Sequence, residues 1–219
     1  MIKNLLKKIS SATLVLVLAF VGFASFEPET VSAVTDAITV NLTVDSGISI
    51  TSPADVTMSN IGVTTNTSTG WAIWNVKTND TDGYTLGVQA SASPAMVSGG
   101  NSFTDYTEAV TGTPDTWSVD ASTYQFGFSA IGSDVENVNT DEYAAAGVTT
   151  CDNGIASTTI NTTLKWEGFT TSNEIIATDS TVTPTAGVDT RICFAAEQNG
   201  VYTPSGAYTA TITATAVVL

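Results

Sequence analysis

The chain has 219 residues, of which 21 are acidic and 6 are basic, and its net charge is −15 at pH 7. A surface this negative repels phosphate groups, because Lys and Arg supply most of the affinity for nucleic acids, so nucleic-acid binding and docking on anionic lipid are excluded. The chain contains no histidine, which also excludes Ser-His-Asp and Cys-His catalytic arrangements.

The first 33 residues have the organisation of an export signal, a signal peptide. Three lysines at the start precede an apolar run over residues 12–26, and a stretch containing proline and two glutamates ends that run. We expect cleavage after Ala33, with a cut after Ala24 as an alternative. A run of about 15 residues is short for an uncleaved anchor, because a membrane-spanning helix needs about 20. Cleavage removes two acidic and three basic residues, which leaves 19 acidic and 3 basic residues, a net charge of −16, and no integral membrane span.

Beyond residue 33 the chain is rich in threonine and alternates apolar and polar residues with a period of two, which is typical of β-strands. Gly, Asn, Asp and Pro separate the alternating segments. In chain order, the predicted strands lie within residues 37–44, 47–51, 54–62, 71–78, 84–92, 124–132, 156–169, 173–178, 189–195 and 206–219. Residues 92–121 are predicted to form loops, and residues 140–148 are a candidate for a short helix.

About ten short strands joined by such turns predict an all-β protein, an antiparallel β-sandwich of the Ig-like or jelly-roll-like kind. Residues 34–219 are expected to form a single elaborated sandwich domain, with two smaller sandwiches as the alternative. The segment 71–78 has apolar residues on both faces, with Trp71 opposite to Ala72 and Trp74. We therefore expect this strand to be central and covered on both sides.

Two cysteines, Cys151 and Cys193, fall in the exported part of the chain, where oxidising conditions favour a disulfide bond between them. Two separate buried thiols are the alternative. Without histidine, two cysteines do not make a zinc site.

Carboxylate pairs could still support glycoside hydrolysis, because that reaction needs only two Asp or Glu residues beside the sugar bond. The candidates are Glu136, Asp141, Glu142 and Glu167, but their spacing selects no pair and few aromatic residues accompany them. We therefore expect no enzyme activity, and a carboxylate-based glycoside hydrolase is the remote alternative.

Calcium is the cofactor that the acidic turns suggest, because hard cations prefer several oxygen ligands. The candidate ligands lie in two turns, with Asp80 and Asp82 in the first and Asp134 and Asp141 in the second. The first turn lacks the first and last ligands of the calcium-loop pattern D-x-[DN]-x-[DN]-G-x5-E. Two solvated turns without metal are the alternative interpretation.

The closing segment, residues 207–219, alternates without a charge or a proline. Its residues that share one face, the candidate assembly strand, are Tyr208, Ala210, Ile212, Ala214, Ala216 and Val218. Exposed sheet edges normally carry charge, proline or a bulge that prevents sheets from joining, so we expect this strand to be covered. Our first expectation is pairing within the chain, with a central position beside residues 38–44. The alternative is pairing with a neighbouring subunit by strand addition.

The opening of this segment, Gly206-Ala207-Tyr208, resembles the closing strand of secreted bacterial surface β-sandwich subunits of the spore-coat-U-type and fimbrial families. The resemblance implies a secreted or cell-surface location and assembly with copies of itself or with other surface proteins. The expected function is a structural subunit of a coat, filament or surface layer, or an adhesin subunit, without catalysis. The alternative is a freestanding extracellular module that binds carbohydrate or protein through residues 93–120, where Tyr106 and Trp117 would contact the ligand.

Overall fold

The computed structural model describes residues 38–135, 143, 148–151 and 158–219, so the predicted signal peptide lies outside the described residues. The chain divides into two units, Met1–Thr43 and Val44–Leu219. All the strands belong to the second unit, and they are β1 (Ile48–Thr51), β2 (Thr67–Thr78), β3 (Tyr84–Ala90), β4 (Val97–Ser98), β5 (Asn101–Ser102), β6 (Thr104–Asp105), β7 (Asp115–Thr116), β8 (Thr123–Ile131), β9 (Lys165–Gly168), β10 (Glu174–Asp179), β11 (Val188–Asn199) and β12 (Ile212–Val218).

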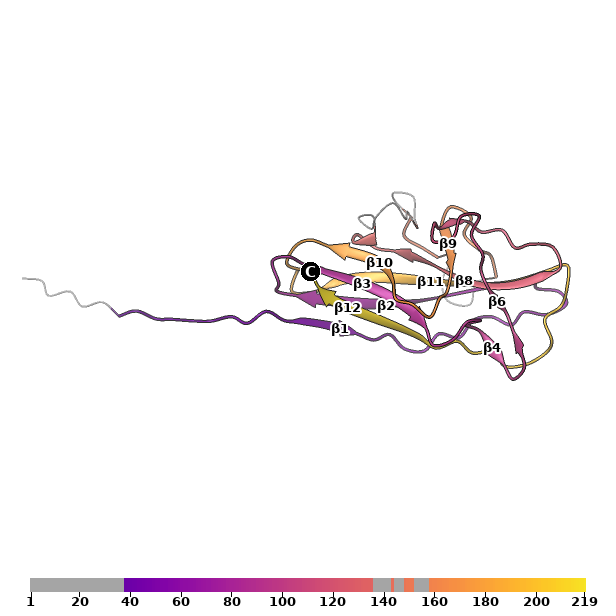
Figure 1. Cartoon of the computed structure of the whole chain (residues 1–219), viewed down its shortest axis with the longest axis horizontal. Coiled ribbons are helices and arrows are strands. Elements are labelled where there is room, and N and C mark those ends of the chain that lie inside the picture. Colours follow the sequence, from indigo (N-terminus) through magenta and orange to yellow (C-terminus); the bar gives the residue numbers. More distant parts are fainter. Residues whose placement is uncertain (1–37, 136–142, 144–147, 152–157) are drawn as a thin grey trace, which may run out of the picture. The chain divides into compact units, whose positions relative to one another are not determined.

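Two sheets pack against each other in this unit (Figure 1). The larger sheet has the strand order β1-β2-β11-β8-β9-β7, with β6 also paired to β8, and the smaller has the order β10-β3-β12. The short strands β4 and β5 form a separate hairpin. The described strand pairs are antiparallel except for β6 with β8. The prediction of an all-β antiparallel sandwich is confirmed, with 12 strands instead of about ten.

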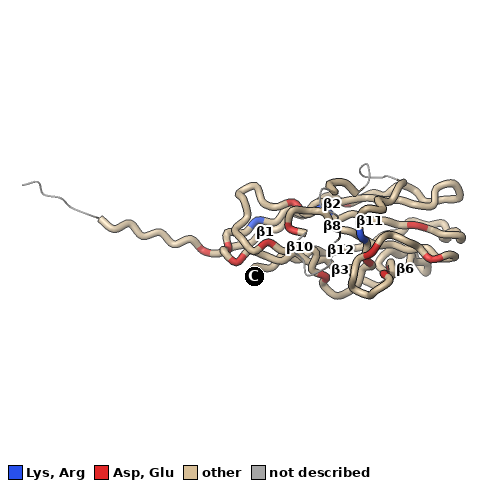
Figure 2. Tube along the Cα trace, turned by 90° about the horizontal axis from the view of Figure 1, so that it is seen from above, with Lys and Arg blue, Asp and Glu red and all other residues tan. Residues whose placement is uncertain are grey.

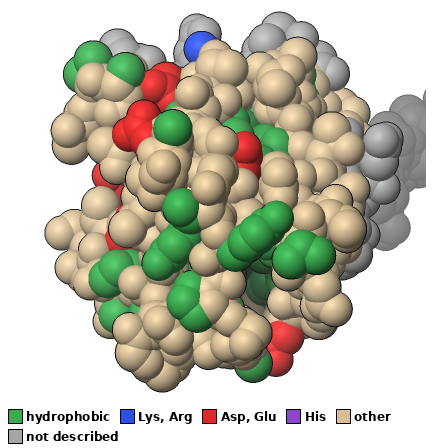
Figure 3. Space-filling view, turned by 90° about the vertical axis from the view of Figure 1, so that its right-hand side faces the viewer, with side chains coloured by type: hydrophobic (Ala, Val, Ile, Leu, Met, Phe, Trp, Pro, Cys, Tyr) green, Lys and Arg blue, Asp and Glu red, His purple; other side chains and the backbone are tan. Residues whose placement is uncertain are grey.

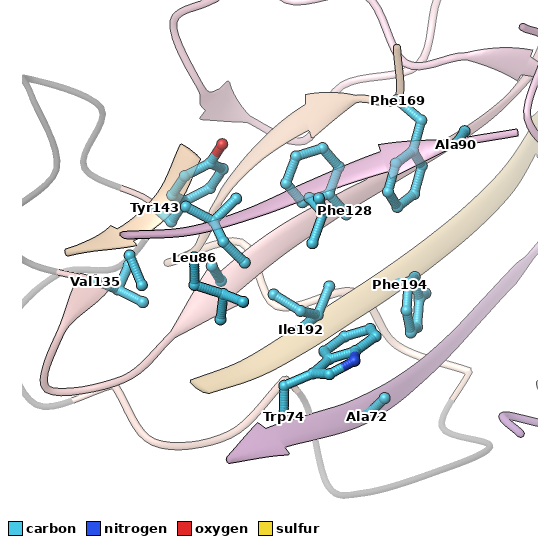
Figure 4. Packing of buried hydrophobic residues seen from close by; sticks show 14 of the residues in the cluster. Ala72, Trp74, Leu86, Ala90, Phe128, Val135, Tyr143, Phe169, Ile192 and Phe194 are labelled. Atoms are coloured by element: carbon cyan, nitrogen blue, oxygen red, sulfur yellow. The ribbon is translucent and has the colours of Figure 1, made fainter. Parts of the chain in front are cut away.

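The main core lies between the two sheets, where large apolar side chains from both layers meet (Figure 4). The ring centroids of Phe128 and Phe169 are 4.5 Å apart, and those of Phe169 and Phe194 are 6.2 Å apart. Leu86 of the smaller sheet and Trp74 of the larger sheet are buried in the same cluster. Removing this much apolar and aromatic surface from water is the main stabilising contribution to the sandwich.

A second apolar cluster covers the other face of the larger sheet. Successive residues of β11 therefore belong alternately to the two clusters, with Phe194 in the main core and Cys193 and Ala195 in the second cluster. The same holds for β2, where Trp74 lies in the main core and Trp71 packs against the second cluster. Because β2 also pairs with β1 on one side and β11 on the other, the prediction of a central strand covered on both faces is confirmed.

The predicted disulfide bond is present and belongs to this second cluster. Cys151 and Cys193 are bonded, with their Cα atoms 5.4 Å apart, and both side chains are buried. The bond ties residues 148–151 to the outer face of β11, so that a segment without a strand of its own is held against the larger sheet.

Two of the predicted strands are wrong. Residues 38–47 and 52–62 form no strand, although both alternate in sequence. In the second segment the apolar residues pack against the main core instead of a strand partner. Val56 and Met58 cover Gly70 of β2 so closely that an added Cβ at Gly70 would lie 2.7 Å from Cγ1 of Val56.

Elsewhere the strand bounds differ from the prediction in both directions, since β2 and β11 are longer than the predicted strands at 71–78 and 189–195, whereas β12 is shorter than the predicted strand at 206–219. Residues 92–121, predicted as loops, contain four strands of two residues each. Within residues 156–169, the described strand is β9 alone. Most of the helical candidate, residues 140–148, lies outside the described residues. The part of the chain that the structure describes holds no helix with the length and apolar character to cross a membrane.

Candidate functional site

The closing strand lies at an edge of the smaller sheet. β12 covers only Ile212–Val218, and β3 is its strand partner among the described residues. The expected central position beside residues 38–44 is therefore wrong, because these residues form no strand. Pairing within the chain occurs, but on one side of β12 only.

The predicted inward-facing set of the closing segment lies largely on one face. The partly buried side chains that pack against the main core are those of Tyr208, Ala210, Ile212, Ala214 and Ala216. Val218, the last of the set, is 37% exposed. The residues between them are mostly threonines that face solvent. Small alanine side chains therefore line much of the inner face of the strand.

The backbone of this segment has one edge without partners in the described structure. Thr209 exchanges hydrogen bonds of 3.0 and 2.9 Å with Val97, and the carbonyl of Thr211 accepts from the N–H of Ser91 at 3.0 Å. Alternate residues of an antiparallel strand direct their N–H and C=O groups to opposite edges. The even-numbered residues from 210 to 218 therefore direct theirs to the other edge, where no described backbone group bonds them.

A groove lined by both apolar residues and threonines runs beside this free edge, between the closing segment and residues 50–58. It encloses about 610 Å³, and Ala72, Trp74 and Phe194 of the larger sheet lie at its base. Ala210 and Ala214 line the side formed by the closing segment. Since β1 lies against β12, the groove opens along the earlier part of the closing segment.

A second hollow of about 610 Å³ continues the groove. It lies between residues 58–63 and 202–208, and the two hollows share Met58 and Met96. Methionine side chains are flexible and polarizable, so they adapt to apolar groups of different shape. We call the two hollows together the edge groove.

The edge groove is nearly free of charge, although the protein is strongly acidic. Asp55 is the one charged residue among those that line it. Figure 2 shows that the acidic residues are scattered along the rest of the described chain. Figure 3 shows one end of the molecule, where hydrophobic side chains reach the surface around hollows. Exposed apolar surface of this kind commonly marks a contact site.

Residues 45–47 are held on the turn between β2 and β3. The N–H of Gly47 donates to Oδ1 of Asn79 at 2.7 Å, and Nδ2 of Asn79 donates to the carbonyl of Asp45 at 2.8 Å. The hydroxyl of Ser46 donates to the carboxylate of Asp80 at 2.6 Å. We call these five residues the N-terminal clamp, because they anchor the chain where it enters the second unit.

The first pair of predicted calcium ligands lies at this clamp. Asp80 accepts from Ser46 and also from the N–H of Asp82 at 3.0 Å, and these two hydrogen bonds lower the pKa of Asp80. Asp134 lies in a different, buried site, and Asp141 lies outside the described residues. No group of three or more His, Cys, Asp and Glu residues in the described part of the chain is arranged to hold a metal ion. Calcium binding stays a prediction.

Asp134 is a buried carboxylate that joins the two sheets. Its Oδ2 accepts hydrogen bonds from the hydroxyls of Tyr84 in β3 at 2.8 Å and Thr190 in β11 at 2.6 Å. Its Oδ1 is buried without a hydrogen-bond partner in the described structure. Burial disfavours the charged form and raises the pKa of Asp134, while the two hydroxyl bonds oppose that rise. Its position indicates a structural link between the layers.

The two aromatic residues expected to contact a ligand are buried, so that expectation is wrong. Tyr106 and Trp117 stack on each other with ring centroids 4.6 Å apart, and they are only 4% and 8% exposed. The indole N–H of Trp117 donates to Glu197 at 2.6 Å, and the hydroxyl of Tyr106 donates to Asp115 at 2.5 Å. Both rings therefore stabilise the second cluster and do not line a surface site.

The structure describes one of the four carboxylates considered for sugar chemistry. Glu167 is buried and accepts a hydrogen bond from the hydroxyl of Tyr143. Glu136, Asp141 and Glu142 lie outside the described residues. No described pair of these carboxylates therefore exists to be tested for the geometry of a glycosidase.

Neither the edge groove nor the N-terminal clamp was predicted from the sequence. The sequence contains the alanines of the closing segment and the apolar residues of 54–62 that line the groove, but the alternation of residues 54–62 predicts a strand. Comparisons with protein-family models, with curated proteins and with solved structures found no match. The resemblance of residues 206–208 to surface subunits stays a prediction.

Proposed function

We propose that the protein is an exported structural subunit that assembles at the cell surface into a coat, filament or surface layer, without catalysis of its own. The observation that carries the proposal is the free backbone edge of the closing segment, which includes β12. This edge has no charge and no proline, and its pairing with β3 contains no bulge. A sheet edge without these protective features readily accepts a further strand.

Two further observations support export. The first 33 residues have the basic, apolar and small-residue regions of a signal peptide. The buried disulfide of Cys151 with Cys193 fits an oxidising compartment outside the cytoplasm. The excess of acidic residues keeps a protein dispersed until specific contacts form, which suits a subunit that travels before it assembles.

A freestanding carbohydrate- or protein-binding module is the rival proposal. It is less well supported, because Tyr106 and Trp117, the aromatic residues that would contact a ligand, are buried. The edge groove instead has a nearly uncharged lining and free backbone groups that suit an extended polypeptide.

Assembly of the processed protein tests the proposal. We expect the purified protein to form polymers above a threshold concentration, visible by electron microscopy and as high-mass species in light scattering. Raising the ionic strength should lower that threshold, because salt screens the repulsion between acidic subunits. A protein that stays monomeric at every concentration and salt level would contradict the proposed function.

A further inference from the structure

The described residues before the N-terminal clamp form an apolar stripe without a partner. Ile38, Val40, Leu42 and Val44 are 85%, 82%, 87% and 73% exposed. Thr39, Asn41 and Thr43 alternate with them, so an extended chain would present all four apolar side chains on one face. Four large apolar residues this exposed in an alternating segment are unusual for a protein in water and indicate a binding partner. We call residues 38–44 the N-terminal stripe.

The edge groove has open space above its alanines. Its lining combines the small side chains of Ala72, Ala210 and Ala214 with larger ones such as Trp74 and Met96. The stripe offers the branched side chains of Ile, Val and Leu. Protein interiors are close-packed, so branched side chains placed above these alanines would fill the open space.

The two surfaces are also complementary along their length. The stripe has seven residues, and so has the part of the closing segment from Tyr208 to Ala214, where four inward-facing residues alternate with threonines. Seven extended residues span about 20 Å. The even-numbered residues of this part have backbone N–H and C=O groups without partners in the described structure, so they can form a ladder with the stripe.

The N-terminal clamp shows that residues 45–47 do not form a hairpin turn. Asp45, Ser46 and Gly47 are instead bonded to Asn79 and Asp80 of the β2–β3 turn. Gly47 is also not among the glycines with a positive φ, although a three-residue hairpin loop normally needs a left-handed residue, usually Gly.

We propose that the N-terminal stripe of one copy adds as a strand to the free edge of the closing segment in a second copy and fills its edge groove. This inference rests on the proposed function, because it names the contact by which the subunits assemble. Each copy has one stripe and one groove, so the contact is head-to-tail. A head-to-tail contact that does not close into a ring generates an open filament.

Two complementary variants separate the roles of the stripe and the groove. The stripe variant, Val40→Asp with Leu42→Asp, places charges on the apolar face. The groove variant, Ala214→Pro, removes an N–H that points away from β3, so the ladder between β12 and β3 keeps its hydrogen bonds. A matched control, Thr171→Asp with Ser172→Asp, adds the same charge to an exposed loop outside the stripe and the groove.

We expect the wild type and the control to form polymers, and each variant alone to stay monomeric in light scattering. An equimolar mixture of the two variants should form a complex of twice the monomer mass and no larger species, because one intact stripe meets one intact groove. If Ala214→Pro loses cooperative thermal unfolding, Ala210→Pro takes its place. Adding the stripe variant to the wild type should also shorten the polymers. Its intact groove binds the stripe of a wild-type copy, but its own altered stripe cannot bind the next groove.

The outcomes distinguish this inference from the proposed function. Polymers of the stripe variant that match those of the wild type would overturn the inference and leave assembly standing. A wild type that never assembles would overturn assembly, and a synthetic peptide of residues 37–45 would then test the groove of the stripe variant. Binding of that peptide, lost with Ala214→Pro, would support the stripe contact, whereas absence of binding would overturn it.

Discussion

Replacing both cysteines, Cys151→Ala with Cys193→Ala, should lower the free energy of unfolding by about 4 kcal/mol. The two residues are 42 positions apart, and the chain-entropy relation for a loop of about this length gives that value. Alanine is the suitable replacement, because both sites are buried among apolar residues and a serine hydroxyl would lack a partner there.

Thermal unfolding followed by circular dichroism measures the effect. For a domain of this size, each kcal/mol shifts the Tm by about 2–4 °C, so the double variant should unfold about 8–16 °C below the wild type. Reducing agent should lower the Tm of the wild type to a similar degree and leave the variant unchanged. The mass of the wild type shows whether the disulfide bond is intact. If it is, and the double variant is less stable than the wild type by under about 1 kcal/mol, the reasoning is refuted.

Three further substitutions test the buried parts of the fold. Burial raises the pKa of Asp134 above its ordinary 3.8, so its contribution to stability is fully present below pH 3.8 and is lost as the pH rises through the folded pKa. Asp134→Asn should remove this pH-dependent loss of stability. Identical pH profiles of the free energy of urea unfolding for variant and wild type would contradict the prediction. Trp117→Phe should lower the free energy of unfolding in urea by about 1.5–3 kcal/mol, because Glu197 loses a hydrogen bond of 2.6 Å. A smaller loss would show that water replaces the indole. Gly168→Ala should cost about 1–3 kcal/mol or more, because its Cβ would lie 2.0 Å from the carbonyl oxygen of Tyr106, and an unchanged Tm would contradict that packing.

Much of the strand pattern was predictable, because the pleat of a strand imposes a period of two on any residue that must face a core. The strand around Trp71 and Trp74 shows this clearly. Apolar residues on both faces predicted a covered central strand, and β2 has apolar clusters on both sides. The disulfide was predictable for a different reason, since two cysteines that follow a predicted export signal have few alternatives.

The same alternation failed for residues 38–44 and 54–62, for two physical reasons. Alternation records that one face of a segment is apolar, but it does not say what covers that face. For 54–62 the cover is the main core itself, without a strand partner. For 38–44 the four apolar side chains are exposed, so the alternation has no strand to form with a neighbour that the structure describes.

The site was less predictable than the fold, because exposure depends on contacts between distant segments. Tyr106 and Trp117 lie in a loop region by sequence, yet they stack together and become buried when β7 pairs with β9. The edge groove likewise needs residues 50–63 and 202–214 to come together. In sequence these two segments are separated by nearly the whole domain, and no local pattern connects them.

Hydrogen exchange of the backbone amides in the assembled protein tests the proposed contact most directly. Alternate amides of the N-terminal stripe should exchange rapidly in the monomeric Ala214→Pro variant and become protected in wild-type polymers, because every second N–H then bonds to the closing segment of the next copy. The amides of Ala210 and Ile212, which face the free edge, should gain protection together with them. Polymers in which residues 38–44 exchange as rapidly as in the monomer would contradict the proposed contact.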